Sequence, residues 1–131
     1  MFYLAEGTLA QVLKGQYEVL DRMRGEALVG LRYVGPFDHL QAQVDARSSH
    51  VVIPWDEVGE VEGTGIVHIA PGCGAEDFEL GKAFGLPAIA PLDENGKIVD
   101  GFDWLSGRDA LEVAGDVIAD LDARGVLYRA D

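Results

Sequence analysis

A histidine and an acidic pair stand at the two ends of a glycine-rich turn near the middle of the chain. His68 lies in an apolar run, and Glu76 and Asp77 follow the turn over residues 71–74, where a helix is predicted to begin. A histidine can hold a water molecule or a substrate hydroxyl, and a carboxylate can bind an ammonium group. This spacing predicts a site for a polar ligand, with His68 and Asp77 as its candidate residues.

Each candidate also has a structural interpretation. His68 could be a hydrogen-bonded core histidine, and the acidic pair could cap free N–H groups and complement the helix dipole. Cys73 in the same turn could be a nucleophile with His68 as its base, or a zinc ligand with His68 and a carboxylate. The single cysteine and the absence of a second Cys/His pair at ligand spacing favour no metal site.

Hydrophobic periodicity predicts the elements that position these residues. Helices are expected over residues 6–14 and 75–84, and a third follows a capping sequence at Ser106–Asp109 and ends at Gly125. A hairpin turn is expected at Asn95-Gly96. Strands are expected over residues 1–4, 17–24, 51–54, 65–69, 88–92, 98–99 and 126–128. The predicted fold class is mainly β with peripheral α (α+β), as a mostly antiparallel barrel or curled sheet.

Length and charge limit the possible functions. The 131 residues suit one domain, and one cysteine fits a reducing compartment. Ten basic against 23 acidic residues give a net charge of −13, which argues against autonomous binding to DNA or RNA. No apolar run reaches the roughly 18 residues of a membrane span, and no export signal is visible. We therefore predict a cytoplasmic protein with no membrane partner.

The run from Gly63 to Asp77, centred on Val-His-Ile-Ala-Pro-Gly over residues 67–72, resembles the editing domain of the isoleucyl-tRNA synthetases, in the class I aminoacyl-tRNA synthetase family. Gly81 and the Phe-Gly-Leu-Pro run at 84–87 extend the resemblance, and His68 favours the isoleucyl over the valyl or leucyl type. The resemblance implies a β-barrel-like editing domain. Residues 1–131 would form a single partial domain shortened at its N-terminal side, because the family's threonine-rich segment has no counterpart here.

The resemblance also implies an activity, as part of an isoleucine–tRNA ligase: post-transfer hydrolysis of mischarged valyl-tRNA(Ile). Asp77 matches the aspartate that holds the α-ammonium group. His68 matches the histidine that contacts the terminal adenosine or the amino acid and helps to position water. Ala70, Pro71 and Gly72 match substrate-binding positions.

No cofactor is implied for the editing domain, since ATP and Mg would serve only the synthetic site of the parent enzyme. The implied partners are the 3′ end of tRNA(Ile) carrying valine and the remainder of the synthetase. The alternatives are a hydrolytically inactive insertion that is structural or binds aminoacyl-tRNA, and an editing domain of the valyl or leucyl type.

Overall fold

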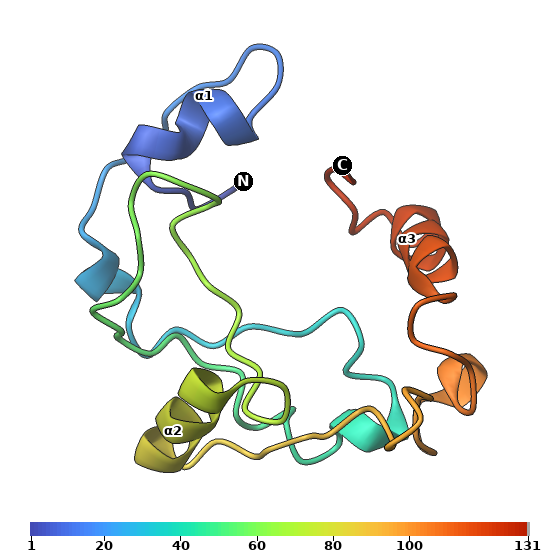
Figure 1. Ribbon diagram of the computed structural model, residues 1–131. Coiled ribbons are helices and arrows are strands. Elements are labelled where there is room, and N and C mark those ends of the chain that lie inside the picture. Colours follow the sequence, from blue (N-terminus) through green and yellow to red (C-terminus); the bar gives the residue numbers. More distant parts are fainter. Residues whose placement is uncertain (131) are drawn as a thin grey trace. The chain divides into compact units, whose positions relative to one another are not determined.

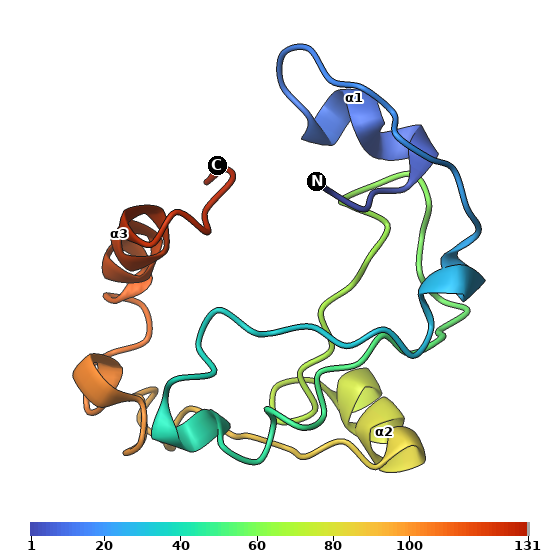
Figure 2. The same ribbon diagram turned by 180° about the vertical axis from the view of Figure 1, so that it is seen from behind.

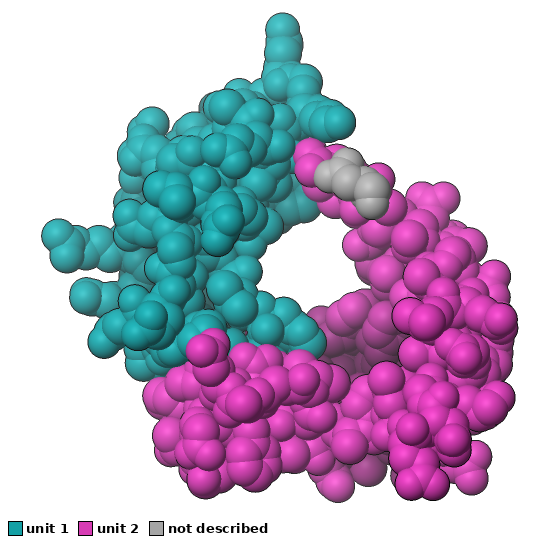
Figure 3. All heavy atoms as spheres, in the orientation of Figure 1, with its two compact units in different colours: residues 1–32, 51–69 teal, residues 33–50, 70–131 magenta. Residues whose placement is uncertain are grey.

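The computed structural model describes residues 1–130, and their contacts group them into two compact units (Figure 3). The first unit contains residues 1–32 and 51–69. The second contains residues 33–50 and the chain from Ala70 onward. The prediction of a single partial editing domain over residues 1–131 stays a prediction.

Helices and turns make up the regular structure of both units. The α-helices, labelled in Figures 1 and 2, are α1 (Leu9–Val12), α2 (Ala75–Phe84) and α3 (Ala114–Ala123). Short 3-10 helices are η1 (Glu6–Thr8), η2 (Gly25–Leu28), η3 (Gln41–Gln43) and η4 (Asp103–Leu105). None of these helices is both long and apolar enough to cross a bilayer, as far as residues 1–130 are concerned.

The prediction of a mainly β, barrel-like fold is wrong. No segment of the described chain forms a β-strand, and Figure 1 accordingly draws no arrow. Antiparallel pairing is limited to three isolated bridges: Arg32 with Val51, Leu92 with Ile98, and Lys97 with Asp109. A strand requires a continuing ladder of hydrogen bonds to a neighbour, whereas alternating side chains require only an extended backbone.

Glycines in left-handed backbone conformations explain why the apolar runs stay short. In the first unit, Gly63 and Gly65 have φ angles of 60° and 73°, just before and at the beginning of the strand predicted over residues 65–69. Gly96 and Gly125 precede predicted strands in the second unit, with φ angles of 76° and 66°. Each such residue turns the chain, so the runs between them pair at single points and do not build a sheet.

The first unit contains no buried apolar side chain among its residues, although several of its apolar side chains are partly buried. Its one fully buried side chain is Thr8, whose hydroxyl donates to the carbonyl of Ala5 at 3.0 Å. The N–H of Ala5 donates in turn to the carbonyl of Thr64 at 2.8 Å. Further along, the amide of Val52 donates to Leu31 at 2.9 Å.

The second unit has a small apolar core. Its buried cluster consists of Leu40, Ile98, Phe102, Leu105 and Val113. Partly buried apolar side chains that pack against this cluster are Phe37, Ala42, Ile89, Val99 and Val117. Residues from η3, the turn around position 96, η4 and the start of α3 therefore share one core, which unites segments that are distant in sequence.

The predicted helices are confirmed to different extents. The second, over residues 75–84, has the bounds of α2, and Gly85 ends it in a left-handed conformation with φ 66°. The first is shorter than predicted, since η1 and α1 together end at Val12. The capping sequence at Ser106 does not begin the third: α3 begins at Ala114, and Ser106 accepts a hydrogen bond from the amide of Phe102 instead.

Candidate functional site

Asp77 lies in the first turn of α2, but its side chain turns back toward the segment before the helix. Its Oδ2 accepts a hydrogen bond from the amide of Ala70 at 2.8 Å. The N-cap residue of α2 is Gly74, which has no side chain to cap the helix. The position of Asp77 suits the positive end of the helix dipole, and its half-buried carboxylate also closes the turn that precedes the helix.

The turn itself is fixed at several points within the second unit. The amide of Cys73 donates to the carbonyl of Ala70 at 2.9 Å. The ring of Pro71 covers Gly81, the one buried residue of α2, so that a Cβ at position 81 would lie 2.8 Å from the Cβ of Pro71. Gly72 meets the main chain of Ile89 so closely that there is no space for a side chain. The Ala-Pro-Gly sequence is therefore a rigid turn that depends on its small residues.

His68 belongs to the first unit, and it is exposed. Within the described residues its ring makes no hydrogen bond or ion pair, so the interpretation as a satisfied core histidine is wrong. Of the predicted site residues, the structure brings together Ala70, Pro71, Gly72 and Asp77, all in the second unit. The roles of His68 and of these four residues in binding a substrate stay predictions.

Cys73 is exposed in the turn, and its thiol is free. No group of three or more His, Cys, Asp or Glu side chains among residues 1–130 is arranged to hold a metal ion. A zinc site that combines Cys73, His68 and a carboxylate therefore has no support in the geometry of these residues.

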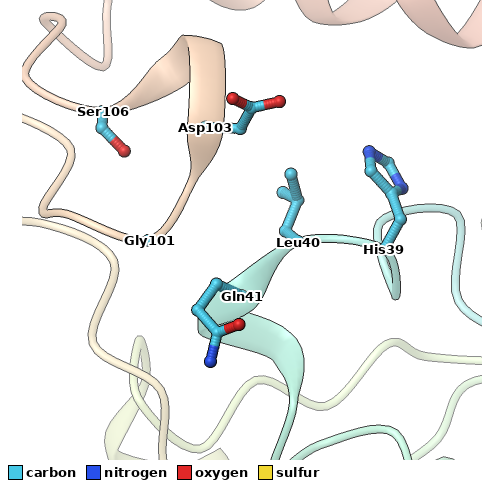
Figure 4. A pocket seen from close by; sticks show the side chains of 6 residues that line it. All are labelled: His39, Leu40, Gln41, Gly101, Asp103 and Ser106. Carbon is cyan, nitrogen blue, oxygen red and sulfur yellow. The ribbon is translucent and has the colours of Figure 1, made fainter.

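A polar hollow of about 390 Å³ lies elsewhere in the second unit. It is lined by His39, Leu40, Gln41, Gly101, Asp103 and Ser106 (Figure 4). Figure 4 shows Leu40 between the carboxylate of Asp103 and the ring of His39, while Gln41 points the other way. Asp103 has a φ angle of 51°, which is unusual for a residue other than glycine. The hollow could not be predicted from the sequence, because the two segments that line it are distant in the chain.

A second hollow, of about 270 Å³, is almost entirely apolar and opens onto the core cluster. Its lining includes Phe37, Pro91 and Val117. None of the predicted site residues lines either hollow.

A cluster of titratable side chains joins the two ends of the segment over residues 33–50. The rings of Tyr33 and His50 stack in parallel with centroids 4.9 Å apart. Nδ1 of His50 lies 3.3 Å from Oδ1 of Asp38, yet it is not aligned for a hydrogen bond and remains a buried atom without one in the described structure. The other Asp38 oxygen accepts from the amide of Gly35 at 2.9 Å.

The surroundings of Tyr33 change the pKa of its phenol. Burial raises the pKa of the Tyr33 phenol above its ordinary 10.0, and the negative charge of Asp38 raises it further. Gly35 has no room for a side chain, because a Cβ there would lie 2.6 Å from Oδ1 of Asp38 and 2.7 Å from Cε1 of His50. The Gly35-Pro36 dipeptide is typical of a turn, but nothing in the sequence indicates that His50 lies against Gly35.

The chemistry open to the turn is the binding of a cation by a fixed carboxylate. One oxygen of Asp77 is held by the Ala70 amide, which fixes the orientation of the carboxylate plane. An ammonium group that approached the second oxygen would form a charge-assisted hydrogen bond. The exposed imidazole of His68 precedes the turn in sequence.

The chain is similar to isoleucine–tRNA ligases over nearly its whole length. It is 41% identical over 129 residues to that of Methanothermobacter thermautotrophicus, a match that covers 98% of this chain and 12% of the relative. It is 41% identical over 133 residues to that of Pyrococcus furiosus, with 97% and 12% covered. For Bdellovibrio bacteriovorus the identity is 34% over 131 residues, with 98% and 12% covered. No protein-family model matches the chain.

These matches show that the chain belongs with the aminoacyl-tRNA synthetases. It spans about 12% of the length of the relatives described above. The synthetase to which it corresponds is isoleucine–tRNA ligase, of which it matches one segment. The predicted resemblance to this family is confirmed.

Proposed function

We propose that this chain is the editing region of an isoleucyl-tRNA synthetase and takes part in hydrolysing valyl-tRNA(Ile). Valine differs from isoleucine by one methylene, from which a hydrophobic pocket gains only about 1–3 kcal/mol, and isoleucyl-tRNA synthetases are themselves an established example of this limit. A second site that removes the smaller product supplies the remaining selectivity. A ligase that must select isoleucine needs such an editing step, and the relatives of this chain are isoleucine–tRNA ligases.

The observation that carries the proposal is the fixed carboxylate of Asp77. Its hydrogen bond from the Ala70 amide orients it before any substrate arrives. The α-ammonium group of the misattached valine would bind to it, and this contact would hold the ester carbonyl in one place. Preorganisation of this kind lowers the entropic barrier of the reaction.

The reaction is the hydrolysis of an ester and needs no further reactant than water. The water oxygen attacks the carbonyl carbon, and the bond from that carbon to the ribose oxygen breaks. The ribose oxygen takes up a proton, and valine leaves as the free amino acid. We assign to His68, with a ribose hydroxyl, the positioning of that water molecule. Ala70, Pro71 and Gly72 would form the wall beside the substrate.

The partners in this proposal are the 3′ end of tRNA(Ile) and the rest of a synthetase, in the cytoplasm. A chain with 23 acidic and ten basic residues offers little to a phosphate backbone. The remaining domains would therefore deliver the acceptor end, and the turn at Asp77 would contact only its terminal aminoacyl-adenosine.

A second candidate function is the binding of aminoacyl-tRNA without hydrolysis. It is favoured by the exposure of His68 and by the position of Asp77 outside both hollows, since catalysis benefits when water is excluded from a site. A half-buried carboxylate of this kind can recognise an ammonium group without accelerating any chemical step.

The test measures deacylation of valyl-tRNA(Ile) and isoleucyl-tRNA(Ile) by this chain and by its Asp77→Ala and His68→Ala variants. Faster release of valine than of isoleucine, abolished in Asp77→Ala, is expected. Binding of the non-hydrolysable 3′-(valylamino)-3′-deoxyadenosine without any deacylation would favour the second candidate. A folded sample that shows no binding and no deacylation would overturn both candidate functions.

A further inference from the structure

The polar hollow of the second unit is built on the core, so its walls are fixed before any ligand enters. Its two segments, residues 39–41 and 101–106, are joined beside the hollow by the amide of Ala42, which donates to the carbonyl of Gly101 at 2.9 Å. Leu40, which lines the hollow, is 3% exposed and belongs to the buried cluster. The hollow is therefore a preformed space of about 390 Å³, within the size range of sites for small molecules.

Asp103 supplies this hollow with a carboxylate that the fold does not use. Its side chain makes neither a hydrogen bond nor an ion pair in the part of the chain that the structure describes, and it lines the hollow. The carbonyl of Asp103 accepts from the amide of Ser106 at 3.0 Å, and the main chain at Asp103 has a φ angle of 51°. A positive φ at a residue other than glycine costs energy, and such residues gather at sites that bind ligands.

Ser106 and His39 add hydrogen-bond donors to the same hollow. Oγ of Ser106 accepts from the amide of Phe102 at 3.0 Å, and its hydroxyl proton has no acceptor within residues 1–130. Nδ1 of His39 lies 3.5 Å from Nη1 of Arg124. A guanidinium group only donates, so this contact assigns the imidazole proton of His39 to Nε2. In Figure 4 the carboxylate of Asp103 lies between Ser106 and His39, so the hollow offers an anionic acceptor with a donor on either side.

This combination of groups selects a small zwitterion. A simple anion would be repelled by Asp103 and by the net charge of −13. A simple cation would leave the two donors unused. A small molecule with both an ammonium group and a carboxylate can pair with all three side chains through charge-assisted hydrogen bonds. The guanidinium of Arg124, next to His39, adds positive charge on the side where the ligand carboxylate would lie.

We propose that the polar hollow is a binding site for a free α-amino acid. The ammonium group of the ligand binds to the carboxylate of Asp103. The ligand carboxylate accepts from Oγ of Ser106 and from Nε2 of His39. This site is separate from the turn at Asp77 and does not rest on the proposed function, although valine released by an editing reaction would be one ligand of this class.

NMR titration of the unaltered chain tests the class of ligand. L-Valine carries both charges, L-valinamide carries only the ammonium group, and N-acetyl-L-valine carries only the carboxylate. L-Valine should shift the amides of Gly101 and Ser106 in a saturable way. Each analogue should bind about tenfold more weakly or worse, because one charge-assisted contact is lost.

Three results of this titration would overturn the proposal. The first is the absence of a saturable shift at Gly101 and Ser106 with L-valine. The second is equal affinity for L-valine and both analogues. The third is a set of shifts confined to the turn over residues 70–74, which would place the amino acid at the proposed editing site instead.

Asp103→Asn tests the anchor of the ammonium group. Asparagine is neutral, retains an acceptor and tolerates the left-handed backbone. This variant should bind L-valine about tenfold more weakly or worse, since the charge is lost. Asp100→Asn, at an exposed carboxylate that does not line the hollow, is the matched control and should bind L-valine like the unaltered chain. Unchanged affinity in a folded Asp103→Asn variant, with the Ile98 amide still protected by its bond to Arg108, would overturn the proposal.

Asp103→Gly separates binding from stability. Glycine adopts a positive φ without strain and has no carboxylate. If Asp103 is present for binding, the urea midpoint of this variant should stay the same or rise, while its affinity for L-valine falls about tenfold or more. A lower urea midpoint together with unchanged affinity would assign Asp103 a structural role and would overturn the proposal.

Discussion

Gly72 lies directly against the main-chain carbonyl of Ile89, and a Cβ atom at position 72 would overlap both the oxygen and the carbon of that group. It would also lie 2.9 Å from the amide nitrogen of Ala90. Main-chain atoms cannot rotate aside as the end of a long side chain can. Any residue other than glycine therefore separates the turn from the segment that covers it.

Gly72→Ala should lower the free energy of unfolding by about 1–3 kcal/mol, the usual cost of an added carbon in a filled space. Urea denaturation measures the change. Gly115→Ala in α3 is the matched control, because nothing lies within 4 Å of the new methyl group. That variant should gain about 0.5–1 kcal/mol from the better helix former. An unchanged or raised free energy of unfolding in Gly72→Ala would contradict the close approach at Gly72.

Gly81→Ala brings two opposing effects together in α2. Alanine favours a helix by about 1 kcal/mol over glycine. The new Cβ would lie 2.8 and 2.9 Å from Cβ and Cγ of Pro71, and crowding of this kind costs about 1–3 kcal/mol. The urea midpoint should therefore fall between those of Gly72→Ala and Gly115→Ala. In a double-mutant cycle, Pro71→Ala should reduce the cost of Gly81→Ala, and strict additivity would argue against the contact.

The Asp93 turn predicts a specific dependence on acid. Oδ1 of Asp93 accepts from the amides of Lys97 at 2.9 Å and Asn95 at 2.8 Å, and these bonds hold the pKa of the carboxyl below 3.8. Because the folded pKa is lowered, the contribution to stability is complete above the unfolded value and is lost as pH falls through the folded value. NMR titration should place the Asp93 midpoint below 3.8. The acid-side loss of stability should be shallower in Asp93→Asn, and a midpoint at or above 3.8 would contradict the turn geometry.

Tyr33 should ionise above pH 10.0 in the folded chain, chiefly because it is partly buried and secondly because Asp38 is near. Asp38→Asn should lower the pKa of Tyr33 without returning it to 10.0, since burial remains. Asparagine can still accept from Gly35, so the local turn is retained. Tyrosinate absorbance, taken as the difference from Tyr33→Phe, measures the pKa. Since this pKa is raised, stability should decrease as pH rises past the unfolded value, and an unchanged pKa in Asp38→Asn would exclude the charge effect.

Local signals predicted local structure. The bounds of α2 and the left-handed Gly85 follow from periodicity and a terminal glycine, and the turn at Asn95-Gly96 is present with Asp93 as its acceptor. The apolar side chains of α2 are not enclosed in a core, since Phe78 and Phe84 are 46% and 44% exposed. The amphipathic pattern identifies a helix, but the partner of its apolar face depends on segments elsewhere in the chain.

Features that depend on distant segments could not be predicted. A period of two in the side chains indicated strands, whereas hydrogen-bonded partners determine whether a sheet forms, and only single bridges are present in residues 1–130. The stack of Tyr33 on His50 and the hollow between His39 and Asp103 likewise depend on contacts between segments that are distant in the sequence. The family resemblance was detectable because the Val-His-Ile-Ala-Pro-Gly run is contiguous.

The burial of Thr8 in place of apolar side chains predicts that the first unit unfolds locally before the second. A unit whose interior is a single threonine with main-chain hydrogen bonds, and no buried apolar side chain, has little free energy to resist local opening. Its amides should exchange with solvent before those of the core around Ile98 and Phe102. Brief proteolysis should accordingly cleave residues 1–32 or 51–69 while the core cluster of the second unit still protects its own chain.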